Sequence, residues 1–61
     1  MPLGAKSVGI VDDHPMMIEG IIAFLSKKQD YVVVDRGETV RDLLRIADEK
    51  RVDVLICELS M

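Results

Sequence analysis

Aromatic and cysteine residues are scarce in this 61-residue chain, which has one Phe, one Tyr, no Trp and one Cys. A lone cysteine, Cys57, excludes an internal disulfide framework and is typical of a protein from a reducing compartment. Because aromatic side chains are few, the core must be built from Val, Ile, Leu and Met. A hydrophobic content of 49% is nevertheless that of a folded domain and not of a disordered segment.

Two further absences limit where the chain acts. It has no run of eighteen apolar residues that could cross a membrane, and its opening residues lack the apolar core of a signal peptide. Lys and Arg number eight against eleven Asp and Glu, for a net charge of -3, whereas a nucleic-acid interface needs a clustered basic face. We therefore expect a soluble cytoplasmic domain that binds neither membranes nor nucleic acids through this segment.

Apolar patterns predict alternating strands and helices. Short apolar or β-branched runs at 8–11, 31–34 and 52–59 predict three strands, and the segment 35–38 is expected to be a turn. A first helix, beginning near Pro15, carries apolar residues at helical spacing: Met17, Ile18, Ile21, Ile22 and Leu25. The inner face of a second helix is expected to consist of Thr39, Val40, Leu43, Leu44 and Ala47. This β-α-β-α-β order predicts a parallel sheet with helices packed on its faces.

Acidic residues follow two of the predicted strands. Asp12 and Asp13 end the first strand, and Glu58 ends the third. If the strand order is 2-1-3, these strand ends form the crevice where α/β sheets bind ligands. Neighbouring strands lie roughly 4.8 Å apart, so the three carboxylates would repel one another unless a cation joined them. Because Mg²⁺ prefers carboxylate oxygens, a divalent-cation site is the simplest interpretation.

Simpler roles are also open for these residues. Asp12 and Asp13 alone could be a polar strand-to-helix loop in which one Asp caps the helix, and Glu58 could be an exposed acid at a strand end. His14 is interpreted as a capping or packing residue at the start of the first helix. Cys57 is interpreted as a small buried hydrophobic residue of the third strand.

The segments VGIVDDHPMMIEGI and VDVLICELSM resemble the receiver domain of bacterial response regulators, in particular the NarL/FixJ type with its helix-turn-helix DNA-binding output domain. The match spans almost the whole chain, with both segments in the family's order and spacing. It implies that residues 1–61 are the N-terminal half of a flavodoxin-like (CheY-like) doubly wound sheet. The parent protein would then receive signals from a histidine kinase in a two-component phosphorelay and regulate transcription.

The resemblance also implies roles for individual residues. Asp12 and Asp13 match the acidic pair that holds Mg²⁺ in the family, and Glu58 falls on the position of the aspartate that accepts a phosphoryl group. Ser60 matches the position whose backbone carbonyl completes the metal shell. As a signalling module of this kind, the chain is not expected to be an enzyme.

Two departures from the family pattern change what we expect. Glu58 stands in place of Asp and moves the carboxylate out by roughly 1.5 Å, so phosphorylation, which depends on positioning, is not expected. The chain also stops at Met61, before the rest of the receiver domain and any output domain. Mg²⁺ binding is therefore expected to be weak or absent here, DNA binding is expected only in the parent, and the exposed edge of the third strand predicts self-association.

Two other functions remain open. A phosphorylation-independent pseudo-receiver would keep the fold and use it as a protein-interaction module, with Glu58 replacing the switch. A cofactor-binding α/β domain is less favoured, because no G-x-G-x-x-G follows the first strand and Met17 stands where a cobalamin-binding motif needs Gly.

Overall fold

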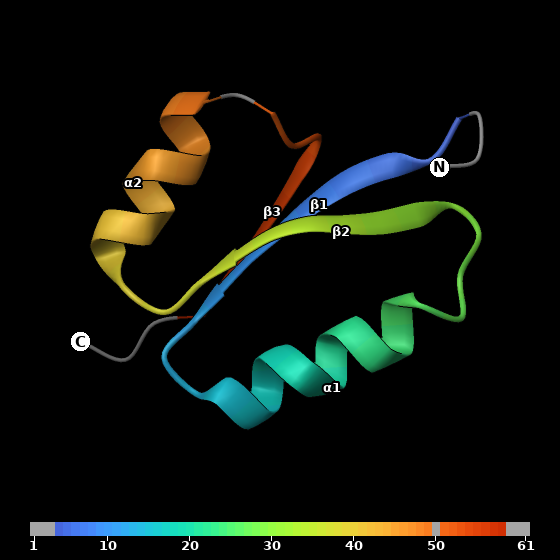
Figure 1. Ribbon diagram of the computed structural model, residues 1–61, viewed down its shortest axis with the longest axis horizontal. Coiled ribbons are helices and arrows are strands. Elements are labelled where there is room, and N and C mark those ends of the chain that lie inside the picture. Colours follow the sequence, from blue (N-terminus) through green and yellow to red (C-terminus); the bar gives the residue numbers. More distant parts are fainter. Residues whose placement is uncertain (1–3, 50, 59–61) are drawn as a thin grey trace.

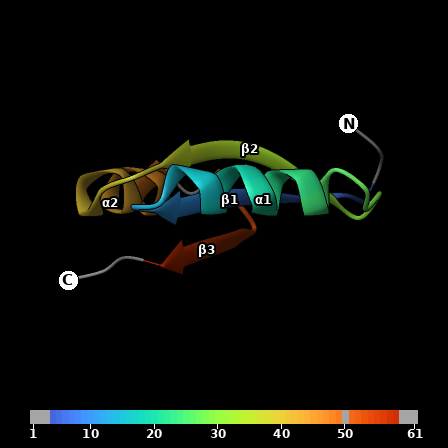
Figure 2. The same ribbon diagram turned by 90° about the horizontal axis from the view of Figure 1, so that it is seen from below.

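The computed structural model describes residues 4–49 and 51–58, in which strands and helices alternate (Figure 1). The elements, in chain order, are β1 (Lys6–Asp12), α1 (Pro15–Leu25), β2 (Tyr31–Gly37), α2 (Val40–Glu49) and β3 (Val54–Glu58). The strands run parallel, and β1 lies between β2 and β3 (Figure 2).

Helix α1 covers one face of the sheet and α2 the other (Figure 1). The predicted fold and the strand order 2-1-3 are confirmed. Neither described helix is long and apolar enough to cross a membrane.

The central strand β1 is the middle of the core, and every residue from Val8 to Asp12 is buried. On the side of α1, Val8 and Ile10 form a buried cluster with Ile18 of the helix. On the side of α2, the Ile46 side chain packs closely over Gly9. If Gly9 carried a Cβ, that atom would lie only 3.1 Å from the Ile46 side chain. Burial on both faces is what a parallel sheet covered by two helix layers requires.

The inner face of α2 differs from the prediction. Ile46, which the prediction left out, is the residue that packs inward with 1% of its surface exposed. Leu43 is half-buried, whereas Leu44 is 64% exposed and Val40 and Ala47 also face solvent. Apolar residues occupy more than one side of this helix, and the missing side chain of Gly9 makes room for Ile46. The contact with the sheet, and not the helical spacing alone, therefore sets the rotation of α2.

The prediction of a turn at 35–38 is wrong for most of that segment, because β2 continues to Gly37 and pairs with residues 9–11 of β1. The pairing register shifts between Val8 and Gly9. Since β2 is at the edge of the described sheet, its polar residues are tolerated there. The Arg45 guanidinium of α2 donates hydrogen bonds of 3.0 and 3.3 Å to the Asp35 carboxylate. These hydrogen bonds lower the pKa of Asp35.

The third strand begins at Val54, two residues later than predicted, and hydrogen bonds fix its start. Asp53 precedes β3 and accepts hydrogen bonds at Oδ2 from the Ser7 backbone N–H, at 2.9 Å, and the Ser7 hydroxyl, at 3.1 Å. Its own N–H donates to the Ser7 carbonyl at 2.9 Å. Cys57, which we expected to be buried, is exposed because it lies near the end of an edge strand that extends away from both helices (Figure 2).

A reciprocal cap begins α2. The Asp42 N–H donates to Thr39 Oγ1 at 3.1 Å, while Asp42 Oδ2 accepts from the backbone N–H groups of Glu38, at 3.0 Å, and Thr39, at 3.3 Å. The Glu38 N–H and then the Thr39 hydroxyl hold the pKa of Asp42 below its ordinary value. A Cβ on Gly37 would collide with the side chain of Asp42. The absence of a side chain at Gly37 therefore leaves the space that Asp42 needs to cap the helix.

Two glycine-to-alanine substitutions should change stability in opposite directions. Gly20 lies inside α1 with nothing within 4 Å of an added Cβ, so Gly20→Ala should raise the free energy of unfolding by about 1 kcal/mol. Gly37→Ala should lower it by about 1 kcal/mol or more, because it displaces Asp42 from the cap. Urea unfolding followed by circular dichroism measures both. A Gly37→Ala protein as stable as the wild type would contradict the role given to this glycine.

Candidate functional site

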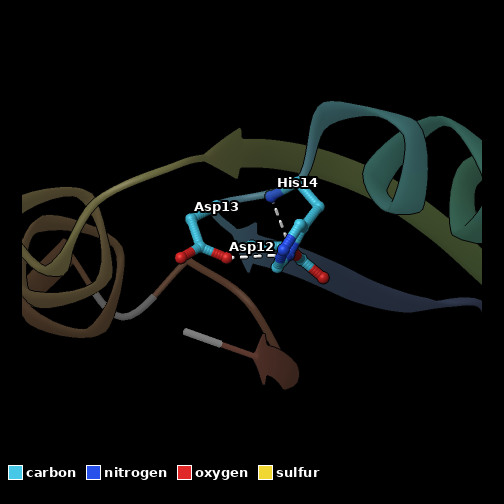
Figure 3. A group of neighbouring side chains, drawn as sticks. All are labelled: Asp12, Asp13 and His14. Carbon is cyan, nitrogen blue, oxygen red and sulfur yellow. Dashed lines mark hydrogen bonds and ion pairs between the residues drawn. The ribbon is translucent and has the colours of Figure 1, made fainter. Parts of the chain in front are cut away.

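The carboxyl ends of β1 and β3 bring two of the predicted acids together. Asp12, the last residue of β1, is the register partner of Glu58, the last residue of β3. Asp13 follows directly in the loop between β1 and α1 (Figure 3). The structure thus places Asp12, Asp13 and Glu58 at one end of the sheet. Ser60, the fourth residue predicted for this site, lies outside the described residues.

Asp12 is the buried member of this group, with 1% of its surface exposed. Its Oδ1 accepts a hydrogen bond from the backbone N–H of His14 at 2.8 Å. Its Oδ2 is also buried and has no hydrogen-bond partner among the described residues. A buried carboxylate oxygen without a partner is costly in free energy, and a cation beside it would remove that cost. The donor chemistry at Asp12 therefore fits a divalent cation.

His14, interpreted from the sequence as a capping or packing residue at the start of the first helix, occupies the N-cap position of α1. Its carbonyl accepts the N–H of Met17 at 2.9 Å, but its side chain makes no capping hydrogen bond. The ring instead turns toward the two aspartates (Figure 3): Nδ1 lies 3.0 Å from Asp12 Oδ1 and 2.8 Å from Asp13 Oδ1. The side-chain hydrogen bond to Asp12, followed by the negative charge of Asp13, raises the pKa of His14.

The three consecutive residues Asp12, Asp13 and His14 could hold a metal ion, because one ligand atom from each lies within 4.8 Å of the others. Glu58 is exposed and is not a member of this group among the described residues. Sequence reasoning missed the direction of the His14 ring. The run of two carboxylates and an imidazole at the end of a buried strand places the ring near the acids but does not determine its direction.

Comparisons with known proteins agree with the fold. The family model described as the response regulator receiver domain matches residues 8–61. Response regulator protein VraR of Staphylococcus epidermidis is 37% identical over 57 residues, which are 93% of this chain and 27% of that protein. No solved structure gives a significant match.

Two further relatives show similar coverage. VraR of Staphylococcus saprophyticus is 37% identical over 51 residues, 84% of this chain and 24% of that protein. Transcriptional regulatory protein YdfI of Bacillus subtilis is 30% identical over 56 residues, 92% of this chain and 26% of that protein. The chain thus spans about a quarter of the length of these relatives. With the family model matching nearly the whole chain, and with the parallel 2-1-3 sheet carrying acids at its carboxyl end, the chain belongs to the response regulator receiver domain family.

Proposed function

We propose that residues 1–61 form the N-terminal half of the signal-receiver domain of a cytoplasmic two-component regulator that controls transcription. The whole protein would take its signal from a histidine kinase and act on DNA through an output domain, and this segment would contact neither DNA nor membrane. The observation that carries the proposal is Asp12, a buried carboxylate with an unpartnered oxygen at the end of the central strand. The relatives' names, response regulator and transcriptional regulatory protein, support the same function.

In this proposal Asp12 and Asp13 hold Mg²⁺, together with the Glu58 carboxylate and the Ser60 backbone carbonyl. The ion, when bound, supplies positive charge to the oxygens of a phosphoryl group. The protein's own part is to bury Asp12 and keep Asp13 beside it, so that the carboxylates are already positioned when the ion binds. The domain would act by changing its contacts with other proteins and not by turnover of a substrate.

The second candidate is a phosphorylation-independent pseudo-receiver that acts as a protein-interaction module. The residue at the end of β3 favours it, because Glu58 is exposed and one methylene longer than the aspartate of the family. Its position opposite Asp12 is retained. In this case Glu58 would keep the local negative charge without accepting a phosphoryl group.

Self-association is part of the proposal for this chain. Within the described residues β3 pairs only with β1, so its outer edge presents unpaired backbone N–H and C=O groups. The strand is also apolar, and Val54, Leu55 and Ile56 are only half-buried. Pairing of this edge with a second chain would satisfy the backbone groups and cover those side chains.

The metal site is tested by titrating Mn²⁺ into the full-length protein and following the fraction bound by electron paramagnetic resonance. Asp13→Asn removes one ligand and should weaken Mn²⁺ binding by about tenfold or more. Asp48→Asn, an equal change of charge on the exposed side of α2, is the matched control and should bind as the wild type does. Equal affinities for the wild type and Asp13→Asn would contradict the assignment.

Phosphorylation is tested with acetyl phosphate and intact-mass spectrometry. We expect no phosphoryl adduct on Glu58, because its carboxylate extends beyond the position that the family's aspartate occupies. In the full-length protein, Glu58→Asp should restore labelling, and Glu58→Gln is the control that cannot be labelled in the same way. An adduct on Glu58 in the wild type would exclude the pseudo-receiver and show that the longer side chain is tolerated.

Self-association is tested by light scattering coupled to size exclusion at micromolar concentration. The 61-residue chain is expected to be a dimer or a larger oligomer. Cys57→Lys places a charge on the exposed part of β3 and should shift the equilibrium toward monomer, whereas Ala23→Lys on the exposed side of α1 should not. A cooperatively folded monomer in the wild type would show that the free edge is tolerated.

A further inference from the structure

The imidazole of His14 has no part in the function proposed above, although it lies between the two carboxylates of the site (Figure 3). It is a nitrogen donor in a group whose other members offer oxygen. Metal ions distinguish these donors, because Mg²⁺ prefers oxygen ligands whereas imidazole favours first-row transition ions. If the His14 ring bound the cation, it would therefore change which cation the site prefers.

The ligand atoms of Asp12, Asp13 and His14 lie close enough together to reach one ion. Adjacent ligands of an octahedral ion with bonds of about 2.1 Å lie roughly 3.0 Å apart. His14 Nδ1 is 3.0 Å from Asp12 Oδ1 and 2.8 Å from Asp13 Oδ1. These contacts are the hydrogen bond and ion pairs described above, and a bound ion would take the place of the proton that they share.

The backbone around His14 is held in place, which positions its ring. The residue before a proline is restricted to extended conformations, and His14 has φ -117° and ψ 100° ahead of Pro15. Its N–H is held by Asp12 Oδ1 at 2.8 Å. The same backbone that caps α1 therefore presents the imidazole on the side of the carboxylates.

An independent observation indicates that this group lacks a ligand. Asp12 is almost fully buried, and its second oxygen, Oδ2, has no partner among the described residues. The contacts of His14 with Oδ1 do not satisfy it. A bound cation would bring positive charge to this carboxylate, which the neighbouring imidazole alone leaves incompletely paired.

We propose that His14 Nδ1 is a further side-chain ligand of the divalent cation, beside the carboxylates, and that it makes the site select Mn²⁺ or Co²⁺ over Mg²⁺. This inference rests on the proposed metal site and adds a nitrogen ligand to it. With Asp12 and Asp13, the ring completes a set of two oxygens and one nitrogen. Water and the Glu58 carboxylate, which lies opposite Asp12, would fill other positions.

The test uses the full-length protein loaded with Mn²⁺ and measured by electron spin echo envelope modulation, which detects a nitrogen nucleus bonded to the ion. We expect a directly coordinated ¹⁴N in the wild type and in Asp48→Asn, and its loss in His14→Gln. Calorimetry should show that His14→Gln weakens Mn²⁺ binding by about tenfold and Mg²⁺ binding much less. Since the His14 side chain is 57% exposed and makes no cap, circular dichroism should show the variant folded.

The outcomes separate this inference from the proposal on which it rests. Mn²⁺ that binds the wild type without nitrogen coupling would overturn the role of His14 and leave the carboxylate site standing. Equal or tighter Mn²⁺ binding by His14→Gln would also overturn it, by showing that the ring competes with the ion. A wild-type protein that binds no Mn²⁺ would overturn the metal site and the inference together.

Discussion

The burial of one carboxylate is the constraint on which this end of the molecule depends. Asp12 lies at the end of the central strand, where packing on both faces of the sheet excludes water from it. Hydrogen bonds from His14 satisfy Oδ1 but leave Oδ2 without a described partner. The apolar packing of Val8, Ile10 and Val11 holds the strand and so keeps the charge buried. The packing of the central strand and the proposed cation site thus both depend on this one side chain.

Much of the fold could be predicted from the sequence because its signals are local. β-branched runs and helical spacing indicate the five elements, and the family resemblance implies the order in which the strands pair. The rotation of α2 could not be predicted in this way, since apolar residues occur on several sides of the helix. Ile46 faces inward because Gly9, distant in sequence, leaves room for it. Likewise, β2 extends through Asp35 because residues 35–37 pair with β1, and Arg45 of α2 neutralises the charge of that acid.

Some features of the candidate site could likewise be predicted from the sequence, and others could not. Asp12 and Glu58 meet because parallel strands end at the same edge of the sheet, and strand order alone is enough to predict this. The direction of the His14 ring depends on side-chain torsions that no local pattern determines. The position of His14 at the start of α1 was therefore predicted correctly, but its approach to the carboxylates was not. The roles of Asp12, Asp13, Glu58 and Ser60 in metal binding remain predictions.

The bonds between Ser7 and Asp53 have a consequence for the order in which the chain can fold. They join residues 46 positions apart. Likewise, the β1–β2 pairing bridges α1, and the β1–β3 pairing bridges both helices and β2. No two strands of the described sheet can pair through a tight turn, whereas α1 can form from neighbouring residues alone. Closing such long loops loses chain entropy before any sheet contact is gained. Helix α1 should therefore form before the sheet. The surroundings of the Asp12 carboxylate would be complete only after β3 has paired with β1.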